Sequence, residues 1–306
     1  ILRTSFHQDL SVPVQCVHQG VALPLHVQDL RGLPGEVQKE RIAAFKDEDR
    51  KKNFDFSQAP LLRLTLLRVG ESAYEMVWTY HHLLLDGWSM PVLMHEMLST
   101  YESLLQGKAP ESGEEDKYED FIWHIQRKDE QEAEQFWKGY LAGVEAPSLL
   151  PFIAKSENRN KGADQQYQKI EWEVEESLHQ ALQAYGQAHH LTLNTVVQGV
   201  WAYLLARYSG QPDALYGVTV AGRPTELAGA EQRVGLYINT LPLRSRVEEE
   251  KQVHAWLEEL QQTHMEARVY SYTSLNTIQS WKGIKGDFFD SLLVFENYPF
   301  GEVLSR

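Results

Sequence analysis

The segment over residues 74–105 constrains the fold most. It joins an expected strand to an expected helix through a loop whose histidine and aspartate side chains could act in catalysis. Residues 74–80, YEMVWTY, are rich in aromatic and β-branched side chains and predict a strand. Apolar residues then recur at helical spacing, with Ser89 suited to cap that helix and Gly107 to end it. The residues between, HHLLLDG over 81–87, therefore lie on a loop held by two regular elements, where reactive groups are often presented.

The loop contains two adjacent histidines followed by an aspartate and a glycine. Histidine is the side chain best suited to take or hold a proton near neutral pH. Asp86 could orient an imidazole or anchor the loop through a basic partner, and Gly87 permits backbone conformations that a Cβ would forbid. No third ligand follows His81 and His82 at a metal-binding spacing. The pattern favours an active-site loop over two histidines that merely bond within a core.

Strand-like and helix-like segments alternate along the chain, which predicts an α/β architecture. Strands are expected over 168–174, 213–220 and 288–295, and helices over 130–141, 176–190, 194–208 and 253–268. A stretch rich in proline and polar residues runs from Ala146 to Gln165. We therefore expect a first lobe over 1–150, a linker over 151–165 and a second lobe over 166–306.

Composition narrows the function classes. The formal net charge of -14 argues against nucleic acid and anionic membranes as partners, since both attract clustered Lys and Arg. No apolar run reaches membrane-spanning length, and no signal peptide opens the chain. The single cysteine, Cys16, fits a reducing cytoplasm.

The loop and four other segments carry a family resemblance. HHLLLDGWS resembles the HHxxxDG motif of condensation domains from nonribosomal peptide synthetases. Further segments resemble family motifs in the same order along the chain: LRTSF at 2–6, YEDFIW at 118–123, VGLYINTLPLR at 234–244 and FENYP at 295–299. The chain opens inside one motif and stops before a later one, so we expect a piece of a larger synthetase with both lobes truncated.

The resemblance implies two chloramphenicol-acetyltransferase-like lobes arranged in a V, with a tunnel between them. Donor and acceptor peptidyl carrier proteins would bring phosphopantetheine-bound substrates to opposite ends of the tunnel, and an adenylation domain would lie next to the domain in the synthetase. The acceptor amine would attack the donor thioester and form a peptide bond. The domain itself would bind no metal, nucleotide or other cofactor.

The resemblance also assigns roles to residues. His82 would be catalytic, either taking a proton from the amine or orienting it and stabilising developing charge. His81 would shape the loop, and Gly87 would lend its N–H to the reacting centre. Asp86 would form a structural ion pair, for which Arg3 of the LRTSF segment is the expected partner.

Four further residues are candidates for lining the tunnel or contacting substrate: Trp88, Ser89, Tyr237 and Asn239. For Tyr237 and Asn239, a role as strand residues that fill the lobe interface is equally consistent with the sequence.

Other functions remain open at this point. An epimerisation domain shares the histidine motif but removes an α-proton, and its usual continuation after DG differs from Trp88-Ser89-Met90. A stand-alone acyltransferase would carry a DFGWG motif, which this chain lacks. A non-catalytic fragment that only docks carrier proteins is the third alternative.

Overall fold

The computed structural model describes residues 1–110, 117–144, 147–151, 168–284 and 286–296. The chain divides into two compact units. Among the described residues, unit 1 comprises Ile1–Gln126 and Arg223–Tyr237, and unit 2 comprises the segments 127–222 and 238–296. The first unit thus ends before residue 150 and takes in a later segment, which differs from the expected lobes.

Helix α4 (Glu130–Tyr140) explains why the boundary lies earlier than expected. Its Ala133 and Trp137 are 0% and 1% exposed and belong to the hydrophobic core of unit 2. The helix is therefore held by the second unit, although it precedes the proline-rich stretch. Most of that stretch, and all of the expected linker except Pro151, lies outside the described residues.

Unit 1 is built on a β-hairpin and a three-stranded sheet. Its elements are β1 (Thr4–His7), β2 (Val14–Val17), β3 (Leu25–Asp29), α1 (Gly35–Arg50), β4 (Leu62–Arg68), β5 (Tyr74–Tyr80), α2 (Ser89–Leu105), α3 (Tyr118–Gln126) and a short 3₁₀ helix, η1 (Ala230–Gln232). Strands β1 and β2 pair antiparallel, and the sheet has the order β3-β4-β5. Strand β3 is parallel to β4, as a connection through α1 allows, and β5 is antiparallel to β4.

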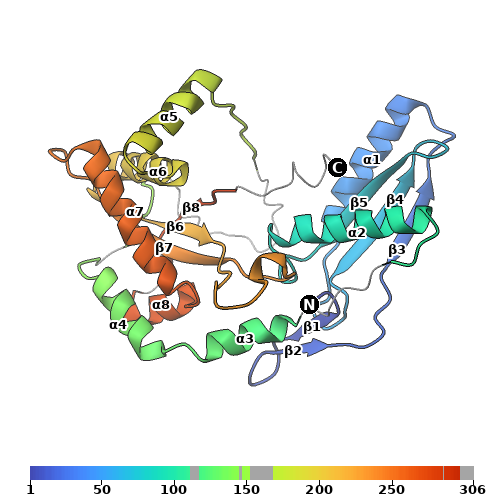
Figure 1. Cartoon of the computed structure of the whole chain (residues 1–306), viewed down its shortest axis with the longest axis horizontal. Helices are drawn as coiled ribbons and strands as arrows, with labels where there is room; N and C mark the ends of the chain where they lie inside the picture. The colour runs from blue at the N-terminus through green and yellow to red at the C-terminus, as the bar shows by residue number, and fades with distance from the viewer. Residues whose placement is uncertain (111–116, 145–146, 152–167, 285, 297–306) are drawn as a thin grey trace. The chain divides into compact units, whose positions relative to one another are not determined.

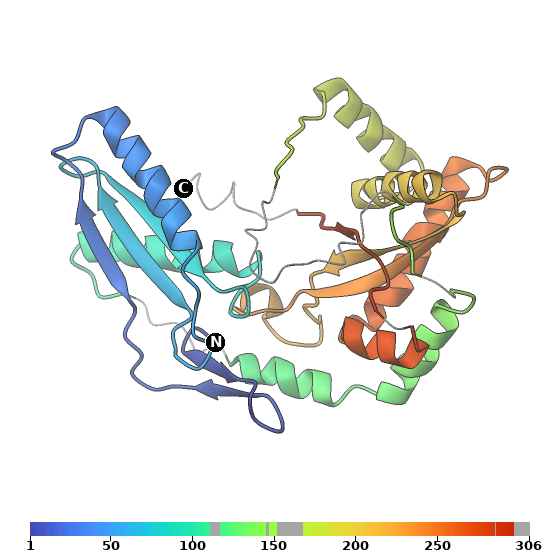
Figure 2. The same cartoon turned by 180° about the vertical axis from the view of Figure 1, so that it is seen from behind.

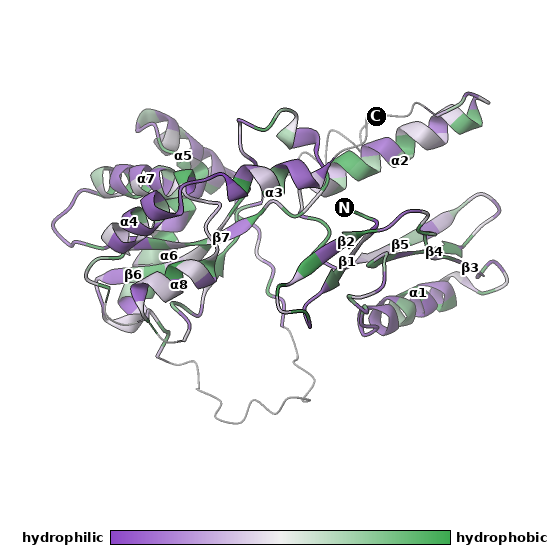
Figure 3. Ribbon diagram, turned by 90° about the horizontal axis from the view of Figure 1, so that it is seen from below, coloured by the Kyte–Doolittle hydropathy of each residue, from purple (hydrophilic) through white to green (hydrophobic). Residues whose placement is uncertain are grey.

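Helices α1 and α2 lie on opposite faces of this sheet, as the front, rear and lower views agree (Figures 1, 2 and 3). Helix α2 carries both hydrophobic and hydrophilic residues along its length (Figure 3). The connection from β5 to α2 carries Leu84 and Leu85, which are both fully buried in the core of unit 1. Two leucines of the HHLLLDG segment therefore fasten this connection to the core.

Unit 2 is a second α/β assembly. Its elements are α4, α5 (Glu176–Ala188), α6 (Leu193–Ser209), β6 (Asp213–Val220), β7 (Asn239–Arg246), α7 (Val253–Val269), α8 (Leu275–Lys282) and β8 (Leu292–Leu293). The sheet order is β7-β6-β8, with β7 antiparallel and β8 parallel to β6. Helix α6 packs against β6, α7 against β7, and α4 against α8.

Most of the predicted elements are confirmed. The strands expected over 74–80 and 213–220 are β5 and β6, and the four expected helices are α4 to α7, with ends shifted by at most two residues. One predicted strand is wrong, and another is shorter than expected. Residues 168–174 form no strand among the described residues, and the strand expected over 288–295 shortens to β8, because only Leu292 and Leu293 pair with β6.

No helix in the described ranges combines the length and the apolar character needed to span a bilayer.

Candidate active site

The candidate site is the loop over residues 81–88, which joins β5 to α2 and is called the HH loop below. Its first residue is fixed beside the start of β4, because the backbone N–H of His81 donates to the carbonyl of Leu61, the residue before that strand, at 2.9 Å. The chain then turns, with the N–H of Leu84 donating to the His81 carbonyl at 3.0 Å. The N–H of Leu83 donates to Nδ1 of His81 at 3.1 Å, so His81 holds the turn through its own side chain.

His81 lies in an aromatic environment. Its ring makes edge-type contacts with the rings of Phe54 and Phe56, at centroid distances of 6.2 and 4.7 Å. Burial lowers the pKa of His81 below its ordinary value, and the neighbouring His82 lowers it further. Because Nδ1 accepts from Leu83, the neutral ring carries its proton on Nε2.

His82 is exposed, in contrast to its neighbour. Among the described residues, no hydrogen bond holds its imidazole. A solvent-facing imidazole on a turn whose ends are fixed can approach a reacting group, and general base catalysis requires that access. Its catalytic role stays a prediction.

Asp86 is fully buried, and both of its carboxylate oxygens are occupied. Oδ1 accepts from the N–H of Ser89 at 2.9 Å, from its hydroxyl at 2.7 Å and from Nη2 of Arg223 at 2.8 Å. Oδ2 accepts from the N–H of Tyr237 at 3.1 Å. The carboxylate therefore works as an anchor of the HH loop and is engaged by partners other than His82.

The partner of Asp86 is Arg223, so the expected pair with Arg3 is wrong. The Arg223 side chain is 5% exposed, and a buried carboxylate needs a cation that is buried with it. Arg3 is exposed, and its Nη1 donates to the carbonyl of His18 across the β-hairpin at 3.0 Å.

Arg223 also holds the segment that follows it in the chain, through hydrogen bonds to two of its backbone carbonyls. Its Nη1 donates to the carbonyls of Ala230 and Arg233 at 2.5 and 2.7 Å, and its guanidinium lies 4.2 Å from the ring centroid of Tyr237. Sequence reasoning missed this residue because it lies 137 positions from Asp86. The available signal was an arginine between glycine and proline directly after a predicted strand.

Ser89 is not a substrate-contacting residue, because it is fully buried and its hydroxyl is occupied within the protein. It also does not cap α2: Trp88 holds the cap position without a side-chain hydrogen bond, and Ser89 is the first helical residue. Asp86 instead accepts a hydrogen bond from the N–H of Ser89.

Gly87 does not have the positive φ that would require a glycine, so the expectation that this position needs glycine for its backbone conformation is wrong. The half-buried Trp88 and the N–H of Gly87 stay predicted substrate contacts.

The side chains of Tyr237 and Asn239 both make contacts within the protein. Tyr237 is 2% exposed and packs against Tyr118 and Phe121 in unit 1, with centroid distances of 5.3 and 4.6 Å. The side-chain amide of Asn239, in unit 2, donates to the carbonyls of Ser271 and Thr273 at 2.8 and 2.7 Å. The structural interpretation is therefore favoured for each of them.

The segment at 118–123 meets the segment at 234–244 within unit 1. The hydroxyl of Tyr118 donates to the carbonyl of Leu236 at 2.5 Å, and Asp120 accepts from Nη1 of Arg233, the residue just before the second segment, at 3.0 Å. Gly235 permits this approach, because a Cβ there would lie 2.4 Å from the Tyr118 ring. The later of these two segments also holds the HH loop, because the carbonyl of Gly235 accepts from the N–H of Asp86.

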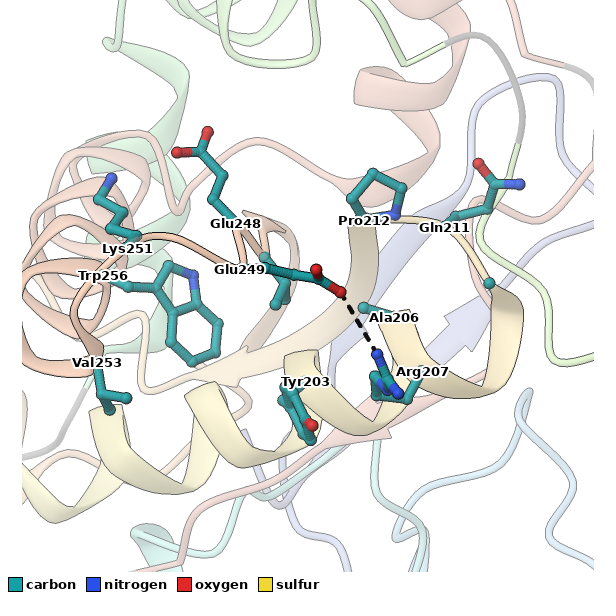
Figure 4. Close-up of a pocket in the computed structure, with 12 residues that line it drawn as sticks. Tyr203, Ala206, Arg207, Gln211, Pro212, Glu248, Glu249, Lys251, Val253 and Trp256 are labelled. Carbon is teal, nitrogen blue, oxygen red and sulfur yellow. Dashed lines mark ion pairs between the residues drawn. The ribbon is translucent and has the colours of Figure 1, made fainter.

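No group of three His, Cys, Asp or Glu side chains among the described residues is arranged to hold a metal ion. A cavity of about 530 Å³ opens in unit 2, between the end of α6 and the connection from β7 to α7. It is lined by Trp256 and Tyr203 and by the Arg207–Glu249 ion pair (Figure 4). None of the predicted site residues lines this cavity.

The chain resembles known proteins over nearly its whole length. Residues 1–305 match the family model described as "Condensation domain". One of the linear gramicidin synthase proteins of Brevibacillus parabrevis is 40% identical over 305 residues, which cover 99% of this chain and 4% of that protein. The chain therefore corresponds to a small part of the curated relative that it matches.

Two solved structures share the fold. One is a four-domain nonribosomal peptide synthetase bound to AMP and glycine, with a TM-score of 0.78 and 20% identity, covering 98% of this chain and 23% of that one. The other is the first condensation domain of the calcium-dependent antibiotic synthetase in complex with a substrate analogue. Its TM-score is 0.72 at 19% identity, covering 96% of this chain and 68% of that chain.

Proposed function

This chain belongs to the condensation-domain family, and on that premise we propose that it forms amide bonds between two thioester-bound substrates in nonribosomal peptide synthesis. Donor and acceptor peptidyl carrier proteins would present these substrates on phosphopantetheine arms, with an adenylation domain as a further neighbour. Two lobes in a V with a tunnel between them are part of the same proposal. So is a cytoplasmic location, which the single cysteine Cys16 fits.

One observation carries the proposal: His82 is exposed on a turn whose two ends are anchored, while the nearby carboxylate of Asp86 is occupied by Arg223. In the proposed reaction the acceptor amine attacks the thioester carbon, so a C–N bond forms and the C–S bond breaks. His82 either takes the amine proton and returns it to the departing sulfur, or holds the amine in place and stabilises charge. Because Asp86 already accepts from Arg223, Ser89 and Tyr237, it acts on His82 through the loop.

The test supplies the natural protein that contains this chain with loaded donor and acceptor carrier proteins, and measures the condensed product. His82→Ala should lower the rate by about 10²–10⁴-fold while the protein stays folded. His95→Ala is the matched control, because His95 is an exposed histidine on the adjoining helix α2.

The outcomes separate the functions. Condensed product that depends on His82 supports the proposal. A near-normal rate in His82→Ala would remove the proton-transfer role and leave positioning. Racemised donor would indicate epimerisation, which the match to the condensation-domain model disfavours. No turnover by the wild-type protein would favour a domain that only docks carriers.

A further inference from the structure

We propose that Ser89 is a positioning residue for this reaction, whose buried hydroxyl fixes the HH loop and thereby the place of His82. The inference rests on the proposed function. Ser89 was expected to contact the substrate, but it is 0% exposed. It can therefore affect the reaction only by fixing the conformation of the HH loop.

The hydroxyl of Ser89 has four polar neighbours. Its Oγ lies 2.7 Å from Oδ1 of Asp86 and 2.9 Å from the carbonyl oxygen of Gly235. It also lies 3.0 Å from the N–H nitrogen of Gly235 and 3.3 Å from Nη2 of Arg223. A serine hydroxyl has one proton and two lone pairs. It therefore donates toward Asp86 or the Gly235 carbonyl and accepts from Gly235 and Arg223, which uses its full capacity.

These contacts join parts of unit 1 that lie 146 residues apart in the sequence. The HH loop is fixed at its start by the bond from His81 to Leu61. At its far end the N–H of Asp86 donates to the Gly235 carbonyl at 3.1 Å, and Ser89 contacts both polar groups of the same glycine. His82 lies between these two fixed ends.

Removing the hydroxyl would loosen only the far end. In Ser89→Ala, the buried N–H of Gly235 loses its acceptor, while the Asp86–Arg223 pair keeps its other contacts. A displacement of about 1 Å at a reacting group can cost about 100-fold in rate. We therefore expect kcat to fall by about 10- to 100-fold in Ser89→Ala, with KM for the loaded carriers unchanged, because no substrate contact is removed.

A purely structural role would lower the amount of folded protein but leave kcat per folded molecule unchanged. Ile278→Val supplies that comparison, because Ile278 is a fully buried core residue of unit 2 whose shortening destabilises the protein mildly. Ser99→Ala removes an exposed serine hydroxyl from the same helix as Ser89. Both variants should keep the wild-type kcat. Ser89→Thr retains the hydroxyl and should stay within about threefold of wild type.

The experiment has two readouts. The first is amide hydrogen exchange at Gly235 in the folded protein, which should be at least about tenfold faster in Ser89→Ala than in wild type. The second is the steady-state rate with loaded carriers. The proposal is supported if Gly235 exchanges faster, kcat falls and KM holds.

Two results would overturn it. Unchanged exchange at Gly235 would mean that the hydroxyl does not hold this amide, and an unchanged kcat despite faster exchange would mean that the contact does not position His82. Failure of the proposed function would look different: wild-type protein would form no product, whereas the exchange measurement would still report on the contact.

Discussion

Replacing Asp86 by asparagine tests the anchor of the HH loop. The substitution keeps the shape of the side chain but removes its charge, in a place where the side chain is 0% exposed and its cationic partner Arg223 is 5% exposed. One oxygen remains to accept from Ser89. The new amide nitrogen replaces the oxygen that accepts from Tyr237, so two N–H donors would face each other.

The magnitude follows from what each partner loses. Breaking a buried ion pair from one side costs about 3–5 kcal/mol, because the remaining charge stays buried. Arg223 keeps two carbonyl acceptors and the face of Tyr237, which places the expected loss near the lower end of that range, about 3 kcal/mol. The unpaired N–H of Tyr237 is part of this loss, at about 1 kcal/mol.

The assay is urea unfolding followed by hydrogen exchange on peptides from each unit, because a chain with two units need not unfold in one step. Asp213→Asn is the matched control. It breaks an arginine pair in unit 2, with Arg244 at 2.6 Å, but these side chains are 30% and 24% exposed. The control should cost about 1 kcal/mol, and in unit 2 alone.

A double-mutant cycle identifies the partner. Asp86→Asn and Arg223→Gln should couple by about 2 kcal/mol, whereas Asp86→Asn and Arg3→Gln should add within about 0.5 kcal/mol. A loss below about 1 kcal/mol for Asp86→Asn, which is ordinary for an exposed pair, would refute the reasoning. Strong coupling to Arg3 would refute the assignment of the partner.

Two further substitutions probe one unit each. Gly235→Ala would place a Cβ 2.4 Å from the Tyr118 ring, so it should destabilise unit 1 by about 2 kcal/mol, and thermal unfolding should show partial rescue when Tyr118→Ala is added. Burial lowers the pKa of His264 from 6.5 to about 4, with Arg268 adding to the effect. As the pH falls from 6.5 to 4, His264 becomes protonated in the unfolded chain but stays neutral in the folded protein. Stability in unit 2 should therefore drop by up to about 3 kcal/mol over that window. His264→Gln should remove this part of the pH dependence, and identical pH profiles for the two proteins would contradict it.

Local sequence patterns were sufficient to predict the helices and strands whose residues next to one another in the sequence determine their structure. The aromatic and β-branched run at 74–80 became β5, and helical spacing of apolar residues located α6 and α7 within two residues. The loop between β5 and α2 was also predictable, because a strand pattern and a helix pattern leave only a short connection between them.

Pairing between distant segments could not be predicted in this way. Ile170 and Trp172 alternate with charged residues as in a strand, yet they are 92% and 80% exposed, because a strand also needs a partner and the described residues provide none. For the same reason, the sequence did not predict Arg223 as the partner of Asp86. Nothing local to Asp86 distinguishes an arginine 137 residues away from Arg3, and only the folded chain shows which guanidinium is buried with the carboxylate.

The segment Arg223–Tyr237 belongs to unit 1, although the strands on either side of it, β6 and β7, belong to unit 2. Within the residues that the structure describes, the chain therefore passes between the units three times, and no single cut separates them. A chimera joined after Gln126 would take its Asp86 from one parent and its Arg223 from the other, so crossover points for exchanging such domains should leave both residues with the same parent. Two further crossovers, placed just before Arg223 and just after Tyr237, would be needed to exchange unit 2 while keeping the anchor of the HH loop whole.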